Sequence, residues 1–286
     1  MYYALIALSV LMFGGCFALQ DTYRNMRGSS FYISQESAFV GALAGFAVLL
    51  VFNGFQIEFT VFTFLIAALA SLNGIMFSFC TFKALDTINL SLFSLFSMLG
   101  GMVLPFLQGI IFYSERLTIA KILCLLLIGA ALCLTVSRSE KKSGTMYCVG
   151  IFVLNGMSGV LSKIFSSSSF EKTSSLGYSI WISICTVVIS GLLLLLLRNT
   201  KAQAPYTLKT FGISASRGVV NRIANLLLVV ALAHVDASVQ YPMVTGGTML
   251  VSTLLCFFGP RKPSKKELIS VVFAFFGLLM LFVVPV

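Results

Sequence analysis

The sequence predicts an all-α membrane protein of ten transmembrane helices, arranged as two inverted repeats of five. Three observations predict this fold class. First, 58% of the 286 residues are hydrophobic and only 10% are charged, with a mean hydropathy of +1.01, whereas a soluble domain carries about 25% charged residues. Second, ten apolar runs approach the roughly 20 residues that a spanning helix needs. Third, the two halves of the chain match each other at a nearly constant offset.

The ten apolar runs alternate with linkers that carry charged and turn-forming residues, such as QDTYRNMRGSS after the first run and SRSEKKSG after the fifth. In chain order the predicted spans are Tyr2–Leu19, Phe31–Phe52, Thr60–Ala84, Ile88–Tyr113, Leu117–Val136, Met146–Ser166, Ser175–Leu197, Phe211–Val235, Ser238–Gly259 and Leu268–Val284. With so many spans the chain is a multi-pass integral membrane protein, and the lipid bilayer is its first predicted partner.

An internal repeat joins the two halves near residues 139–144, which gives a first repeat over residues 1–141 and a second over 142–286. A shift of 147 residues superimposes Ala84-Leu85 on Ala231-Leu232, Ser91 on Ser238, Gly100 on Gly247 and Met102 on Met249. A shift of 145 residues superimposes Met1-Tyr2 on Met146-Tyr147, Met12 on Met157 and Gly14 on Gly159. Because each repeat holds an odd number of spans, the second is expected to be inverted. Secondary transporters often have this architecture, with the substrate site between the halves near the midplane.

The distribution of basic residues predicts the orientation. The loops after odd-numbered spans, with their flanks, hold thirteen of the nineteen lysines and arginines, and the opposite side holds four. Cytoplasmic loops carry the excess of positive charge. We therefore expect the odd-numbered loops in the cytoplasm and both termini outside, in a plasma (inner) membrane.

The remaining two basic residues, Arg217 and Arg222, lie inside the eighth predicted span. A charged residue at this depth costs roughly 2.5–3.5 kcal/mol on insertion scales, so it must face protein or water. At 100° per residue, Arg217, Asn221 and Asn225 share one helix face, and Arg222 lies at its edge. The stripe predicts a cavity in which these four residues bind an anionic substrate group. The alternative is that the arginines are structural and pair with carbonyls or acidic side chains.

Further polar residues fall near mid-depth in other predicted spans. Asn73 and Asn155 offer donors and acceptors for a polar ligand, although interhelical hydrogen bonds explain buried amides equally well. Ser97 and Thr245 flank two glycine pairs in equivalent places of the two halves and are expected to face the same cavity.

Glu36 in the second span lies six or seven residues from the same membrane face as Arg217. Two interpretations are open: an ion pair with Arg217 that opens and closes as the halves rock, or a proton carrier. The alternative is that both side chains lie at the interface and extend to the headgroups.

Small residues at regular spacing predict close helix packing, with a hinge or a substrate passage as the alternative. They are Gly41, Gly45, Gly100, Gly101, Gly246 and Gly247. The aromatic residues Tyr178, Trp181 and Tyr241 lie near predicted helix ends, where interfacial anchoring is expected; a wall against an aromatic or quaternary-amine substrate is the alternative.

Several function classes are disfavoured by the composition. The seven cysteines are scattered through apolar runs without C-x-x-C spacing, and the single histidine, His234, has no nucleophile or metal ligand nearby. No cofactor, metal or catalytic residue is therefore predicted. The net charge of +10 arises in short loops, so it indicates orientation rather than nucleic-acid binding.

The segment FKALDTINLSLFSLFSMLGGMVLPFLQGIIFYSERLTIAKILCLLLIGAALCLTV resembles the third-to-fifth helix block of EamA-type members of the drug/metabolite transporter superfamily. The second half is similar through Ala231-Leu232, Ser238, Pro242, Gly246-Gly247 and Gly277. The resemblance covers the whole length and implies a ten-helix exporter.

We therefore expect a secondary active transporter that moves a small polar metabolite, such as an amino acid or an organic acid, by alternating access. The chain lacks a G-x-x-x-x-G-K-[ST] loop, so a coupling proton or other ion is the implied energy source. The protein would act as a monomer or homodimer. The alternatives are an exporter of drugs or organic cations, with Glu36 as the counter-charge, and a membrane-embedded lipid-modifying enzyme.

Overall fold

The computed structural model describes residues 2–113, 142–197 and 205–258, apart from residues 233 and 236, together with short stretches within 119–127 and 262–277. These residues form helices and connecting turns, with no strand among them. The helices with defined bounds are α1 (Tyr2–Arg27), α2 (Phe31–Phe52), α3 (Val61–Ala84), α4 (Leu90–Tyr113), α6 (Lys142–Ser167), α7 (Ser175–Leu196), α8 (Leu208–Leu232) and α9 (Ala237–Cys256).

Seven of these helices, all except α9, contain stretches long and apolar enough to cross a membrane. The chain is thus an all-helical, multi-pass membrane protein. The predicted fifth and tenth spans, Leu117–Val136 and Leu268–Val284, lie largely outside the described residues.

The first helix is longer than its apolar run predicts. The sequence places its end at Leu19, but α1 continues through QDTYRNMR to Arg27. The polar turns remain helical because carboxylates neutralise Arg24 and Arg27 where the helix is buried. The helix then ends at Gly28, whose φ of 102° suits a glycine and whose amide donates to the Arg24 carbonyl at 2.7 Å.

Hydroxyl groups mark the beginnings of three spans. Ser30, Thr60 and Ser174 occupy the N-cap positions of α2, α3 and α7, and each side-chain oxygen accepts a hydrogen bond from an amide in the first helical turn. Such caps satisfy amides that have no partner within the helix.

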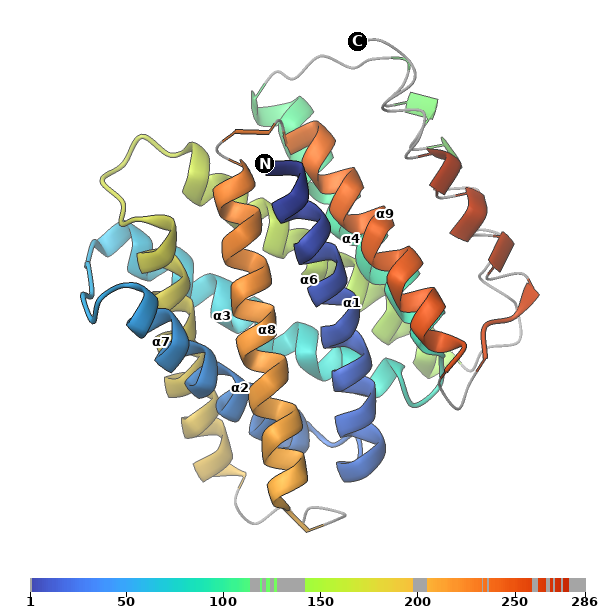
Figure 1. The fold of residues 1–286 in the computed structure, drawn as a ribbon, viewed down its shortest axis with the longest axis horizontal. Coiled ribbons are helices and arrows are strands. Elements are labelled where there is room, and N and C mark those ends of the chain that lie inside the picture. The colour runs from blue at the N-terminus through green and yellow to red at the C-terminus, as the bar shows by residue number, and fades with distance from the viewer. Residues whose placement is uncertain are drawn as a thin grey trace.

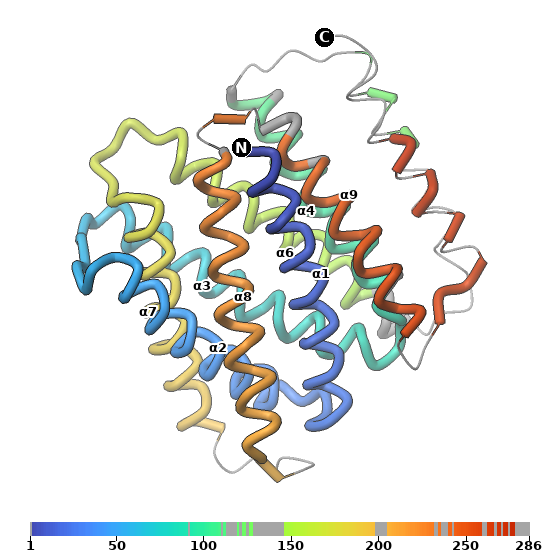
Figure 2. Tube along the Cα trace, in the orientation of Figure 1, coloured from blue at the N-terminus to red at the C-terminus, as the bar shows by residue number. Residues whose placement is uncertain are grey.

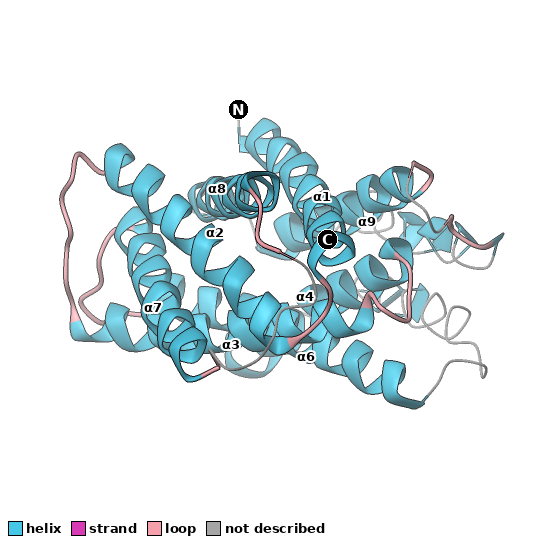
Figure 3. Cartoon of the chain, turned by 90° about the horizontal axis from the view of Figure 1, so that it is seen from below, coloured by secondary structure: helices cyan, strands magenta, loops and turns pink. Residues whose placement is uncertain are grey.

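Helices that are distant in the sequence lie side by side (Figure 1). Helix α1 packs between α8 and α9, as the chain trace also shows (Figure 2). Helix α8 packs on both α1 and α2, while α6 packs on both α3 and α4. The view from below separates α2 and α8 from α4 and α6 (Figure 3). This arrangement brings side chains from all eight helices around one central space.

Candidate functional site

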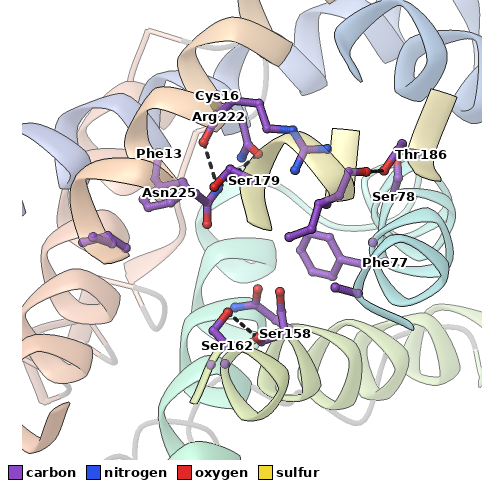
Figure 4. Close-up of a pocket in the computed structure, with 18 of the residues that line it drawn as sticks. Phe13, Cys16, Phe77, Ser78, Ser158, Ser162, Ser179, Thr186, Arg222 and Asn225 are labelled. Carbon is purple, nitrogen blue, oxygen red and sulfur yellow. Dashed lines mark hydrogen bonds between the residues drawn. The ribbon is translucent and has the colours of Figure 1, made fainter. Parts of the chain in front are cut away.

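A cavity of about 320 Å³ lies at the centre of the helix bundle. Each of the eight helices contributes residues to its wall. Figure 4 shows Arg222 and Asn225 of α8 on one side and Ser158 and Ser162 of α6 on the other. The volume of the cavity is at the lower end of the roughly 300–1,000 Å³ range of small-molecule sites.

The polar stripe of α8 faces this cavity. Arg217, Asn221, Arg222 and Asn225 all line it, so the structure brings together the four residues that the helical periodicity predicts on one side. The amide nitrogen of Asn225 donates to the Asn221 carbonyl at 2.8 Å and to its side-chain oxygen at 3.2 Å. The two asparagines therefore form one polar surface next to the arginines.

Glycines on α2 make room for the two arginines. A Cβ on Gly218 of α8 would lie 2.0 Å from the carbonyl oxygen of Gly41, so the two helix backbones touch. A Cβ on Gly45 would lie 2.6 Å from Cγ of Arg222, and one on Gly41 would lie 3.4 Å from Nη2 of Arg217. The spacing Gly41-x-x-x-Gly45 thus serves close packing, as the sequence predicts, and also gives space to the arginine side chains.

The arginines have few partners. Arg217 donates one hydrogen bond, from Nη2 to the Ser37 carbonyl at 3.3 Å, and its buried Nε has no acceptor. Within the described part of the chain, Arg222 has neither a hydrogen bond nor an ion pair. Neither side chain resembles a structural arginine with filled donors.

No carboxylate lines the cavity among the residues that the structure describes. Four of the five described acidic residues bind groups near the helix ends instead. Asp21 and Asp86 pair with Arg24, Glu36 pairs with Arg27, and Glu58 accepts from the Ser174 amide. The two cations of α8 therefore have no counter-ion from this part of the protein.

Buried polar atoms without a partner gather at the cavity. Ten such side-chain atoms occur in the described chain, and six of them belong to lining residues. They are Gln20 Nε2, Ser78 Oγ, Tyr178 Oη, Arg217 Nε, Gln240 Oε1 and Thr248 Oγ1. Since buried polar groups are normally hydrogen-bonded, this concentration indicates a space that a polar ligand or water fills.

The other predicted substrate residues divide between the cavity and the helix contacts. Asn155 and Thr245 line the cavity, and Asn155 also donates to the Ser97 carbonyl at 2.6 Å. Asn73 and Ser97 are not among the lining residues. Asn73 donates to the Leu154 carbonyl at 2.8 Å, which is the interhelical bond that the sequence leaves as the alternative.

Glu36 lies beside Arg27 rather than Arg217. Its carboxylate receives two hydrogen bonds from Arg27, at 2.6 and 3.1 Å, and one from the Tyr23 hydroxyl at 2.5 Å. The pairing with Arg217 that the sequence offers as one interpretation is absent, because the extension of α1 brings Arg27 close to the start of α2. Tyr206, in the segment before α8, covers Arg27, with 5.3 Å between the guanidinium carbon and the ring centre.

The glycine pairs lie at helix contacts. A Cβ on Gly100 would meet the Phe152 backbone, and one on Gly101 would lie 2.7 Å from the Asn155 amide. Gly247 faces Val10 of α1, and Gly246 is buried. These contacts agree with the packing interpretation.

The positions of two tyrosines differ from the main expectation. Tyr178 and Tyr241, for which interfacial anchoring is the main expectation, instead line the cavity. Apolar flanks near a helix end look the same in sequence whether the end faces lipid or protein. Trp181 is not among the lining residues, and its Nε1 donates to the Glu58 carbonyl at 2.7 Å.

Sequence reasoning missed several polar members of the wall. Gln20, Ser78, Ser158, Ser162, Ser179 and Gln240 all line the cavity. The signal for Ser78 was available, because it occurs 147 residues before Asn225 and thus at the same place in the other half. The predicted first span ends at Leu19, one residue before Gln20, so the sequence places Gln20 in a linker.

Comparison with known proteins shows the fold only. No family model and no curated protein matches the chain. It is similar to a solved structure described as "Crystal structure of protein", with 16% identity and a TM-score of 0.65, over 97% of this chain and 96% of that one. The two proteins therefore have a similar fold over nearly the whole of both chains.

Proposed function

We propose that the protein is a secondary transporter that carries a small anionic metabolite through the central cavity by alternating access. The single observation behind this proposal is the pair of arginines that line the cavity without a carboxylate among the described wall residues. Intramembrane charge of this kind is costly and typically marks a substrate or ion pathway. Organic acids and amino acids are the substrate classes that the sequence predicts, and export is the direction that the EamA-type resemblance implies.

The helix packing supports the inverted-repeat part of the proposal. When α1–α4 are matched in order with α6–α9, the extensive contacts come in corresponding pairs: α1–α8 with α6–α3, α2–α8 with α7–α3, and α4–α6 with α9–α1. The contacts α2–α7 and α4–α9 correspond to themselves. A two-fold relation between the halves would produce this pattern, so the helix contacts support a substrate site between the two halves.

Helix lengths agree with the same correspondence. Helices α1 and α6 each have 26 residues, α2 and α7 each have 22, and α3 and α8 have 24 and 25. The shift of 147 residues carries the first residue of α3 onto that of α8, and the first residue of α4 onto that of α9.

The exporter of organic cations receives less support. Glu36, its proposed counter-charge, is bound to Arg27 and is not a lining residue. For a lipid-modifying enzyme, the described residues hold no group of three metal-ligating side chains.

Transport by purified protein in proteoliposomes tests the proposal. We expect saturable uptake of an organic anion in the wild type and its loss in Arg222→Gln, because the variant cannot neutralise the anion. Lys209→Gln is the matched control, since Lys209 is an exposed cation on the same helix. Equal transport by wild type and Arg222→Gln would contradict the assignment of the site.

A further inference from the structure

We propose that the cavity is selective for a small dianion, either a dicarboxylate or a phosphate monoester, over an amino acid zwitterion or a monocarboxylate. The inference rests on the proposed transport function and narrows its substrate class. It depends on the charge balance and on the hydrogen-bonding groups of the cavity wall.

The charge balance separates the ligand classes. Arg217 and Arg222 bring two positive charges to the cavity, and no described wall residue brings a negative one. A dianion cancels both charges, a monoanion leaves one, and a zwitterion leaves both. Uncompensated charge in a low-dielectric interior is strongly unfavourable, so the dianion is the ligand that the wall neutralises.

Unpartnered donors outnumber unpartnered acceptors at the wall. Arg222 offers its whole guanidinium, and Nε of Arg217 and Nε2 of Gln20 are buried without an acceptor. Among the six buried atoms without a partner that belong to lining residues, Gln240 Oε1 is the one that accepts and cannot donate. Carboxylate and phosphate oxygens only accept, whereas an ammonium group needs several acceptors.

Several polar atoms of the wall are buried without a partner. Gln20 is 4% exposed, Gln240 is 2% exposed and Thr248 is fully buried, although one polar side-chain atom of each lacks a partner. Hydroxyls of Tyr178 and Ser78 add groups that can donate to an anion. The wall is thus polar at several independent points around the arginines.

Both cations lie on the same wall of the cavity, the one formed by α8. Arg217 and Arg222 are five residues apart on α8, which corresponds to a rise of about 7.5 Å along the helix axis. The corresponding positions on α3, 147 residues earlier, are Ala70 and Ile75, which also line the cavity and are uncharged. Anionic groups are therefore drawn to α8, and the rest of the ligand faces the hydroxyls of Ser78, Ser158 and Ser162.

A matched ligand series tests the proposal on the full-length protein. The probes are malonate, succinate and glutarate, each with its monoamide, together with 4-aminobutyrate as the zwitterion and glycerol 3-phosphate with glycerol. Binding is measured by ligand-induced thermal stabilisation, and transport by uptake into proteoliposomes. We expect at least one dianion to bind at least about tenfold more tightly than its monoamide or the zwitterion. The dicarboxylate and phosphate arms identify which dianion is preferred.

Variants test the origin of the preference. In Arg217→Gln or Arg222→Gln, the ratio of monoamide to dianion affinities should fall below about threefold, because one charge is gone. Arg222→Lys should retain the preference, and Lys209→Gln should leave it unchanged. If a glutamine variant does not fold, the wild-type ranking of dianion, monoamide and zwitterion decides the question alone.

Two results overturn the inference in distinguishable ways. Binding of the monoamide or the zwitterion as tightly as every dianion contradicts the dianion preference, and saturable transport of those ligands then leaves the proposed transporter function in place. The absence of saturable transport for every probe contradicts both proposals.

Discussion

Two pairs of arginines are enclosed by the helices, and their surroundings differ. Arg24 and Arg27 of α1 are 8% and 2% exposed, and carboxylates hold both. Arg217 and Arg222 of α8 line the cavity, where no described carboxylate reaches them. Burial of a cation therefore does not by itself mark a binding site in this protein. We base the proposed ligand site on the cations that lack a described counter-ion, because their charge is available to a ligand.

The largest expected effect separates the two pairs by stability. Arg27→Met should lower the free energy of unfolding by about 3–5 kcal/mol, because it leaves the Glu36 carboxylate without its cation. Arg222→Met should leave stability unchanged or raise it, because no partner loses a bond. Unfolding of both variants in detergent micelles, under identical conditions, provides the measurement.

A double variant controls for lost packing around Arg27. Arg27→Met/Glu36→Met removes both charges and should recover most of the stability. Equal destabilisation by Arg27→Met and Arg222→Met would abolish the distinction between a structural and a ligand-binding pair.

The next largest effect is expected at the backbone contact between α2 and α8, which lies beside Arg217. Gly218→Ala places a methyl group 2.0 Å from the Gly41 carbonyl oxygen, so α8 must move away from α2. We expect a loss of about 2–3 kcal/mol in stability, typical of overpacking. Gly74→Ala on α3 is the control, because a Cβ there meets nothing within 4 Å. That control should be neutral or stabilising, by up to about 1 kcal/mol; a similar loss in both variants would refute the contact.

A smaller effect is expected from Gly45→Ala, which crowds the stem of Arg222 at 2.6 Å. The flexible side chain can yield, so stability should change by less than about 1 kcal/mol while anion affinity falls about fivefold. Isothermal titration with the anion identified by the transport panel gives the affinity. Unchanged affinity would show that the position of Arg222 tolerates displacement. Gly212→Ala on α8 is the reference for affinity, because a Cβ there meets nothing within 4 Å and Gly212 is not a lining residue.

The smallest expected effect is the contribution of Tyr206, which covers Arg27, to stability at alkaline pH. Burial, followed by the nearby Glu36 carboxylate, raises the pKa of the Tyr206 phenol above its ordinary value of about 10. A raised folded-state pKa contributes stability below the unfolded-state value, and this contribution is lost as the pH rises through the folded-state value. Tyr206→Phe should therefore lose less stability than wild type as the pH rises above about 10. The measurement is the melting temperature of both proteins as a function of pH. An equal decrease for wild type and Tyr206→Phe would contradict the prediction.

Much of the site follows from elementary constraints on the sequence. Two arginines inside an apolar run must avoid lipid, and helical periodicity places Asn221 and Asn225 with them. The structure has all four along the cavity. Gly41 and Gly45 likewise lie where small residues allow helix contact.

The other features of the site depend on contacts between helices, which the helical periodicity of the sequence does not predict. In one interpretation of the sequence, Arg217 is the partner of Glu36. In the structure Glu36 pairs with Arg27 instead, because α1 continues past its apolar run as far as Arg27. Asn73 and Asn155 have the same side chain at similar depth, yet only Asn155 lines the cavity. Which of two amides bonds to a neighbouring helix is decided by rotation of each helix against its neighbours.

The contact between Gly41 and Gly218 has a mechanical consequence. Backbone touches backbone there, so no side chain cushions the crossing and the helices cannot slide past each other without a clash. If the protein transports by the rocking motion proposed above, this crossing would act as a pivot: the distant ends of α2 and α8 would swing, while points beside the pivot would hardly move. Arg217 is the immediate neighbour of Gly218 in the chain. Its charge would stay nearly stationary while the pathway on either side opens and closes around it.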